Sequence, residues 1–206
     1  MVLSHERTGR ATMLCGGAGL ALGGILWGLV GVPFTHIVSA GVWNAAASIV
    51  ICGAAASLAV GQRHGVGIVG RSQWGIAALI LFGARNLVLV VFGWIAVATS
   101  TATGGVSPIA AVVNSVLVIA FALATLAAGF VAIRAGILHG FARWTLFAVG
   151  CCYLLSIPFY FVSWEPVASI LGYLGPLLVA ITGLSYVFHG RLSRIQARAR
   201  TVNEQW

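Results

Sequence analysis

The chain of 206 residues lacks both lysine and aspartate, and its only acidic side chains are Glu6, Glu165 and Glu204. Without lysine, no Schiff base to retinal or pyridoxal phosphate forms, and no Walker A lysine holds a nucleotide phosphate. Without aspartate, a phosphorylated aspartate, an aspartic protease dyad and an aspartate-rich metal–diphosphate site are all excluded. The chain is therefore not an ATPase by itself, and the sequence predicts no catalytic residue, no metal and no cofactor.

Charge of any sign is scarce, because only 7% of the residues are charged and 60% are hydrophobic. An average soluble domain carries roughly 25% charged residues. Long apolar runs, each long enough to cross ~30 Å of hydrocarbon, recur along the chain. They predict one all-α integral membrane domain over residues 1–189, a six-helix bundle arranged as three hairpins. The predicted spans are 12–32, 38–61, 75–98, 108–133, 142–163 and 166–189.

Arginine supplies all the basic residues and marks one side of the membrane. Ten of the eleven arginines lie near the chain ends and in two alternate loops, whereas the loops at 33–37, 99–107 and 163–166 have none. Because basic residues accumulate in cytoplasmic loops, we expect both termini to be cytoplasmic. A lysine-free chain rich in arginine, alanine and glycine is typical of a GC-rich genome. We therefore expect a multi-pass protein of a bacterial plasma (inner) membrane.

The last segment, 190–206, is predicted to be a basic amphipathic tail in the cytoplasm. Arg191, Arg194 and Arg198 share one helical face, and apolar residues share another. Such a helix lies on an anionic leaflet, with ~1 kcal/mol gained per arginine. The expected partners are thus the lipid bilayer and anionic lipid headgroups. Nucleic acid is not expected, because few arginines and no aromatic platform are present.

One arginine, Arg85 in "FGARNLVLVVFG" (82–93), lies inside an apolar run. It is ten residues into its span, near the middle of the bilayer, where a charge costs at least ~2.5–3.5 kcal/mol. No acidic residue lies deep in any span, so Arg85 must be paired with backbone carbonyls, water or a bound anion. Pro176 removes one N–H from span six and frees the carbonyl of Gly172 at a similar depth. Interrupted helices of this kind often form transporter binding sites.

Polar residues in the outer halves of other spans complete the candidate site. If they converge, the bundle holds an outward-opening polar pocket for a small anion or polar solute, with Arg85 and Asn86 at its floor. In one alternative, Arg85 joins span three to the carbonyls of span six; in another, it docks a partner membrane subunit. The candidate substrate-binding residues are Arg85, Asn86, Asn44, Asn114, Tyr160 and Tyr173.

Small residues recur at a period near 3.5 in the first two spans and predict close backbone contact between these two helices. A docking face for a partner helix is the alternative. The stripe in span one is Gly17, Ala21, Gly24, Gly28 and Gly31, and that in span two is Gly41, Ala45, Ser48, Cys52, Ala55 and Ala59.

Histidine–glycine pairs close spans two, four and six at His64, His139 and His189. Glycine and histidine both suit helix C-termini, so we interpret the pairs as caps. A three-histidine metal site at the inner surface is the alternative. The four cysteines fall inside spans and are interpreted as small apolar fillers.

The stretch "AVGCCYLLSIPFYFVSWEPVASILGYLGPLLVAITGLSYVFHGRL" resembles the acid-resistance membrane protein family of the HdeD type, over roughly residues 142–191. The resemblance implies three hairpins, with Gly150, Pro166 and Gly183 at family positions, and it transfers no catalytic residue. "LALGGILWGLVGVPF" looks like the first span of drug/metabolite transporters.

Taken together, these features favour a non-enzymatic permease for a small solute or anion. The alternative is a stress-linked or assembly-type accessory protein that acts through helix contacts, including contacts in a homo-oligomer. A third hypothesis is a metal-independent membrane enzyme that relies on histidine, tyrosine and arginine.

Overall fold

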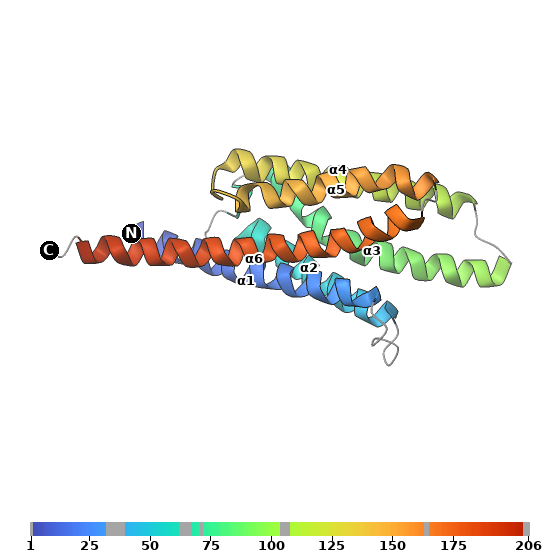
Figure 1. Ribbon diagram of the computed structural model, residues 1–206, viewed down its shortest axis with the longest axis horizontal. Coiled ribbons are helices and arrows are strands. Elements are labelled where there is room, and N and C mark those ends of the chain that lie inside the picture. Colours follow the sequence, from blue (N-terminus) through green and yellow to red (C-terminus); the bar gives the residue numbers. More distant parts are fainter. Residues whose placement is uncertain are drawn as a thin grey trace.

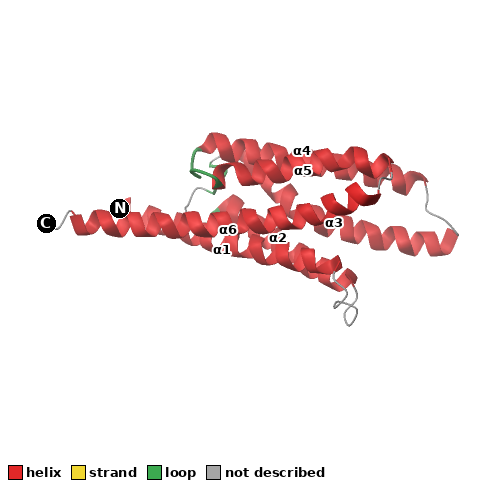
Figure 2. Ribbon diagram, viewed as in Figure 1, coloured by secondary structure: helices red, strands yellow, loops and turns green. Residues whose placement is uncertain are grey.

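The computed structural model describes residues 2–31, 40–61, 67–70, 72–103, 108–162 and 165–203, and most of these are helical (Figure 2). Within these residues there are six α-helices, and a 3-10 turn (Leu29–Gly31) follows the first. All six are long and apolar enough to cross a membrane, which confirms the all-α, six-span prediction. The helices are α1 (Val2–Gly28), α2 (Ala40–Val60), α3 (Gln73–Thr103), α4 (Pro108–Ala135), α5 (Ala142–Val162) and α6 (Glu165–Asn203).

The helices form a ring in chain order. Each helix packs on the next one in the sequence, and α6 returns to pack along α1, so the ring is closed (Figure 1). The start of α1 and the end of α6 lie at the same end of the bundle. The described loops also gather at this end (Figure 2). We call it the terminal end below.

Glycines bring α1 and α6 into backbone contact. A Cβ atom added to Gly24 would lie 2.5 Å from the backbone nitrogen of Ala180 and 2.8 Å from the carbonyl oxygen of Pro176. One added to Gly183 would collide with the backbone of Gly17 and Ala21. The small-residue stripe of span one therefore faces α6. The prediction that it faces span two was wrong.

The small-residue stripe of α2 faces α3 rather than α1. A Cβ atom on Gly83 of α3 would lie 2.5 Å from Cβ of Ala55 and 3.1 Å from Cα of Cys52. The contact between α1 and α2 uses a different set, in which Gly16, Gly19 and Gly23 meet Leu58, Ala54 and Ile51. α1 thus has two small-residue faces, one toward α6 and one toward α2, and the sequence periodicity identified only the first.

Span six is not interrupted, although the sequence predicted a break. α6 passes through Pro176 as one continuous helix and extends to Asn203. A proline also lies inside α5, at Pro158, without ending that helix. The segment 190–203 is helical and continuous with the span, and its side chains beyond Leu192 lie outside the described part of the chain.

The connection before α3 helps to close the terminal end of the bundle. The backbone N–H of Ile68 donates a hydrogen bond to the carbonyl of Leu58 at 3.0 Å. Ile68 and Val69 are each 1% exposed, so these two side chains are buried against the helix ends. Gly67 makes this possible, because a Cβ atom there would collide with the backbone of Ala59 and Leu58.

The contact between α1 and α6 makes a prediction about stability. Gly24→Leu should lower the free energy of unfolding by about 1–3 kcal/mol or more, because the added side chain must separate two backbones. Gly53→Leu is the matched control, since a Cβ atom at Gly53 has no neighbour within 4 Å. Thermal unfolding in detergent would measure both variants. Equal melting temperatures for Gly24→Leu and wild type would contradict the packing.

Candidate functional site

A cationic and aromatic cluster lies where three alternate helices meet. Cζ of Arg85 (α3) lies 3.6 Å from the ring centroid of Tyr153 (α5) and 5.9 Å from that of Trp27 (α1). The two aromatic rings lie 6.4 Å apart, at an interplanar angle of 54°. Because α1, α3 and α5 are not neighbours in the ring, their side chains meet in its middle. Arg85 therefore joins three helices that make no other extensive contact with one another among the described residues.

Gly175 allows a fourth helix, α6, to approach this cluster. A Cβ atom added to Gly175 would lie 3.2 Å from Cε1 of Tyr153 and 3.7 Å from Cη2 of Trp27. Any larger side chain would press on both rings. α6 thus closes one side of the aromatic pair only because glycine stands at this position.

The guanidinium group of Arg85 is short of hydrogen-bond acceptors. Its Nε and Nη1 atoms are buried and have no hydrogen-bond partner among the described residues. Neither atom reaches a carbonyl of α6, so these two donors do not join α3 to α6 as the alternative interpretation proposed. Tyr153 beside them is 5% exposed and Asn86 is 8% exposed. Arg85 itself is half-buried, so the cation lies partly covered among mostly buried neighbours.

The aromatic contacts only partly offset the cost of this charge. A cation–π contact contributes about 0.5–1 kcal/mol at exposed sites and ~2 kcal/mol when desolvated. The more distant ring, Trp27, is close to the limiting distance of ~6 Å for such contacts. Burying the charge costs at least ~2.5–3.5 kcal/mol, and each unsatisfied donor adds about 1–3 kcal/mol. A further partner with acceptor atoms would therefore bind Arg85 favourably.

The contacts described in the structure do not place the other predicted site residues against Arg85. Asn44 is partly buried on α2, whereas Asn114 on α4 and Tyr173 on α6 are exposed, Tyr173 by 57%. Among the contacts described, none joins these three to Arg85. Tyr160 lies on α5, and its side chain is outside the described part. The polar pocket of six residues stays a prediction, and Asn86 is placed beside Arg85 by sequence alone.

Sequence reasoning missed Trp27 and Tyr153, although a signal was present. Tyr153 and Arg85 both lie roughly 17 Å along helices that run in the same direction, at 1.5 Å per residue. A tyrosine hydroxyl in the middle of an apolar span is as unusual as a charge there. Comparing the depth of polar and aromatic groups in odd-numbered spans would have paired Tyr153 with Arg85. Trp27 gave a weaker signal, because it lies near the end of its span.

Two of the three histidines of the histidine–glycine pairs meet at the terminal end. The prediction that these pairs cap spans four and six was wrong, because α4 ends at Ala135 and α6 continues past His189 to Asn203. The rings of His139 and His189 stack with centroids 5.8 Å apart and an interplanar angle of 12°. His64 lies outside the described residues. Within the described residues, no group of three histidine, cysteine or acidic side chains is close enough to hold a metal ion.

Comparison of the chain with models of protein families, with curated proteins and with solved structures gave no match in any of the three. Function must therefore be argued from the geometry of the site.

The cation–π contact predicts energetic coupling between Arg85 and Tyr153. Tyr153→Leu should lower the free energy of unfolding more in the wild type than in the Arg85→Gln background, by about 0.5–2 kcal/mol. The reason is that only the wild type has a cation–π contact between Arg85 and Tyr153 to lose. Tyr153→Phe keeps the ring face and is the control. Equilibrium unfolding of the four proteins in mixed micelles measures the difference. Strictly additive effects would mean that the ring and the cation do not interact.

Proposed function

We propose that this polytopic membrane protein is a permease for small monovalent anions and that Arg85 binds the anion inside the bundle. The observation that supports the proposal is the half-buried Arg85, whose buried Nε and Nη1 atoms have no hydrogen-bond partner among the described residues. An anion supplies both the missing acceptors and the missing opposite charge. Tyr153 and Trp27 would exclude water around the pair, which strengthens the electrostatic attraction.

The charge count favours a monovalent anion over a divalent one. Among the described side chains, Arg85 is the one arginine in the middle of a span. Arg134 is exposed near the end of α4, and Arg191 is exposed near the end of the apolar stretch of α6 (Gly172–Leu192). Arg143 lies at the start of α5, where its Nε donates to the carbonyl of Ile133 at 3.1 Å. A divalent anion at Arg85 would keep one negative charge unpaired in a low-dielectric interior, which is strongly unfavourable.

A second candidate function follows from the same cluster. If the aromatic rings alone stabilise Arg85, the residue acts as a link between α1, α3 and α5, and the protein is an accessory membrane protein that acts through helix contacts. The 3.6 Å approach of Arg85 to Tyr153 supports this version, since one face of the guanidinium group is already covered. The resemblance to the HdeD-type family is compatible with it. Transport measurements separate the two candidates.

Transport of a permanently charged anion is the test. In vesicles that contain the purified protein, Arg85→Gln should lower the initial rate of nitrate or methanesulfonate entry at least tenfold, because a desolvated charge pair loses several kcal/mol when one partner is removed. Arg85→Lys keeps the charge and should retain part of the rate. Sulfate should enter slowly in every variant.

The matched control is Arg134→Gln, which removes an exposed arginine that lies over the ring of Phe130 at 4.8 Å. It should leave the rate unchanged. Folding of each variant is checked by its melting temperature. If wild-type vesicles take up none of these anions faster than empty vesicles do, the permease proposal fails and the accessory role is favoured.

The orientation we propose has both chain ends in the cytoplasm of a bacterial cell, with the terminal end of the bundle inward. The distribution of arginine supports it. Ile109 and His139 are exposed and lie just inside the start of α4 and just past its end. In a cysteine-free background, Ile109→Cys should react with an impermeant maleimide on intact cells, whereas His139→Cys should react only after lysis. The reverse pattern would invert the topology.

A further inference from the structure

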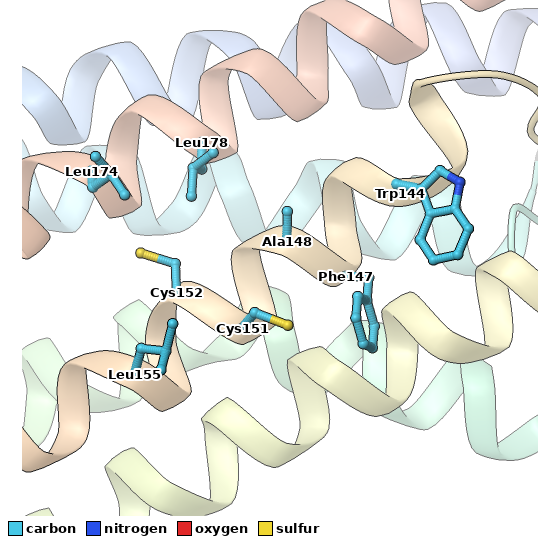
Figure 3. A pocket seen from close by; sticks show the side chains of 8 residues that line it. All are labelled: Trp144, Phe147, Ala148, Cys151, Cys152, Leu155, Leu174 and Leu178. Atoms are coloured by element: carbon cyan, nitrogen blue, oxygen red, sulfur yellow. The ribbon is translucent and has the colours of Figure 1, made fainter.

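An apolar groove runs along the outside of the bundle between α5 and α6. It has a volume of about 440 Å³, and every side chain that lines it is apolar or a cysteine (Figure 3). Cys152 forms part of its floor and is 7% exposed. Trp144, Leu155 and Leu174 form its rim and are 54%, 64% and 38% exposed.

The groove has the length of one leaflet of a bilayer. From Trp144 to Leu155 along α5 is about 16 Å at 1.5 Å per residue, and half of the hydrocarbon core is ~15 Å. Trp144 lies two residues after the start of α5, at the terminal end of the bundle. The groove therefore begins at one membrane surface and ends near the bilayer middle.

The groove suits an occupant narrower than a helix. Its volume of about 440 Å³ is spread over ~16 Å of α5, whereas a helix is ~10 Å across. A single extended hydrocarbon chain is narrow enough. A transmembrane segment of another protein, or a second copy of this chain, would cover the groove without filling it.

Two arginines, Arg143 and Arg191, lie near the terminal end of the groove. Arg143 precedes Trp144 directly, and its Nε is held by the carbonyl of Ile133. The hydroxyl groups of Thr145 and Ser185 lie 3.4 Å apart, so Ser185 of α6 is level with the start of α5. Arg191 is exposed and lies about 9 Å further along α6, at the depth of lipid headgroups. The described side chains include no acidic group, so nothing in this part of the chain opposes a phosphate here.

We propose that the groove between α5 and α6 binds one acyl chain of an anionic phospholipid, whose phosphate is held by Arg143 and Arg191. The site differs from ordinary lipid contact in having a buried floor and a charged mouth. It is independent of the proposed transport function, because it rests on a different cavity and on different arginines.

A phospholipid with a photoreactive diazirine in one acyl chain tests the site. The full-length protein is reconstituted with a trace of labelled phosphatidylglycerol or labelled phosphatidylcholine, irradiated and mapped by peptide mass spectrometry. We expect adducts on the α5 and α6 residues of the groove, with a severalfold preference for phosphatidylglycerol. Arg143→Gln combined with Arg191→Gln should abolish that preference and leave the adducts in place.

Ala148→Trp fills the groove from an exposed position and should reduce these adducts severalfold. Ala77→Trp is the matched control, because Ala77 is exposed at a similar depth of α3, across the ring. It should leave the yield of adducts in the groove unchanged.

Adducts spread evenly over the helices, or unaffected by Ala148→Trp, would overturn the proposal. Adducts in the groove with equal yield from both lipids would overturn the proposed preference for an anionic headgroup. Cross-links between two copies of the protein at α5 and α6 would mean that the chain covers its own groove.

Discussion

The partial burial of one guanidinium group among six apolar helices is the constraint on which the arrangement of the cluster depends. Lipid offers no acceptor to Arg85, so the bundle must cover the charge itself. Tyr153 and Trp27 supply ring faces from α5 and α1, and both helices must therefore reach the middle of the ring. Among the described residues, no cation–π contact to Arg85 comes from α6. Its Gly175 instead allows the helix to approach the rings.

Backbone contact between α1 and α6 closes the ring around that cluster. In a membrane no hydrophobic force drives helices together, so the contact depends on van der Waals packing over small residues. At Gly24 and Gly183 the two backbones touch, and this fixes how far Trp27 can lie from α6. The glycines of α1 thus act on the site indirectly, through the position of the helix that carries Trp27.

The pair α5 and α6 separates two environments. On α5, Cys152 forms part of the floor of the outer groove, and its neighbour Tyr153 covers Arg85 inside the ring. On α6, Leu174 lines the groove and Gly175 faces the aromatic rings. Because successive residues of a helix point about 100° apart, adjacent side chains serve the lipid side and the inner side. A change in the tilt of either helix would alter both sites together.

Composition and the lengths of the apolar runs by themselves determined the six helices and their spans, because crossing ~30 Å of hydrocarbon requires about 20 apolar residues whatever surrounds them. They also identified Arg85 as the residue to explain, since a charge in such a run is costly in any fold.

Which helix faces meet was decided only by the tertiary structure. The small-residue stripe of α1 could have packed against α2 or α6, because such a stripe permits close approach of another helix but does not determine which helix it is. The same holds for Trp27 and Tyr153, because the sequence shows that they lie in apolar spans but not that their rings contact Arg85. The periodicity of small residues describes one helix, whereas a contact between helices depends on the rotation and the membrane depth of both helices.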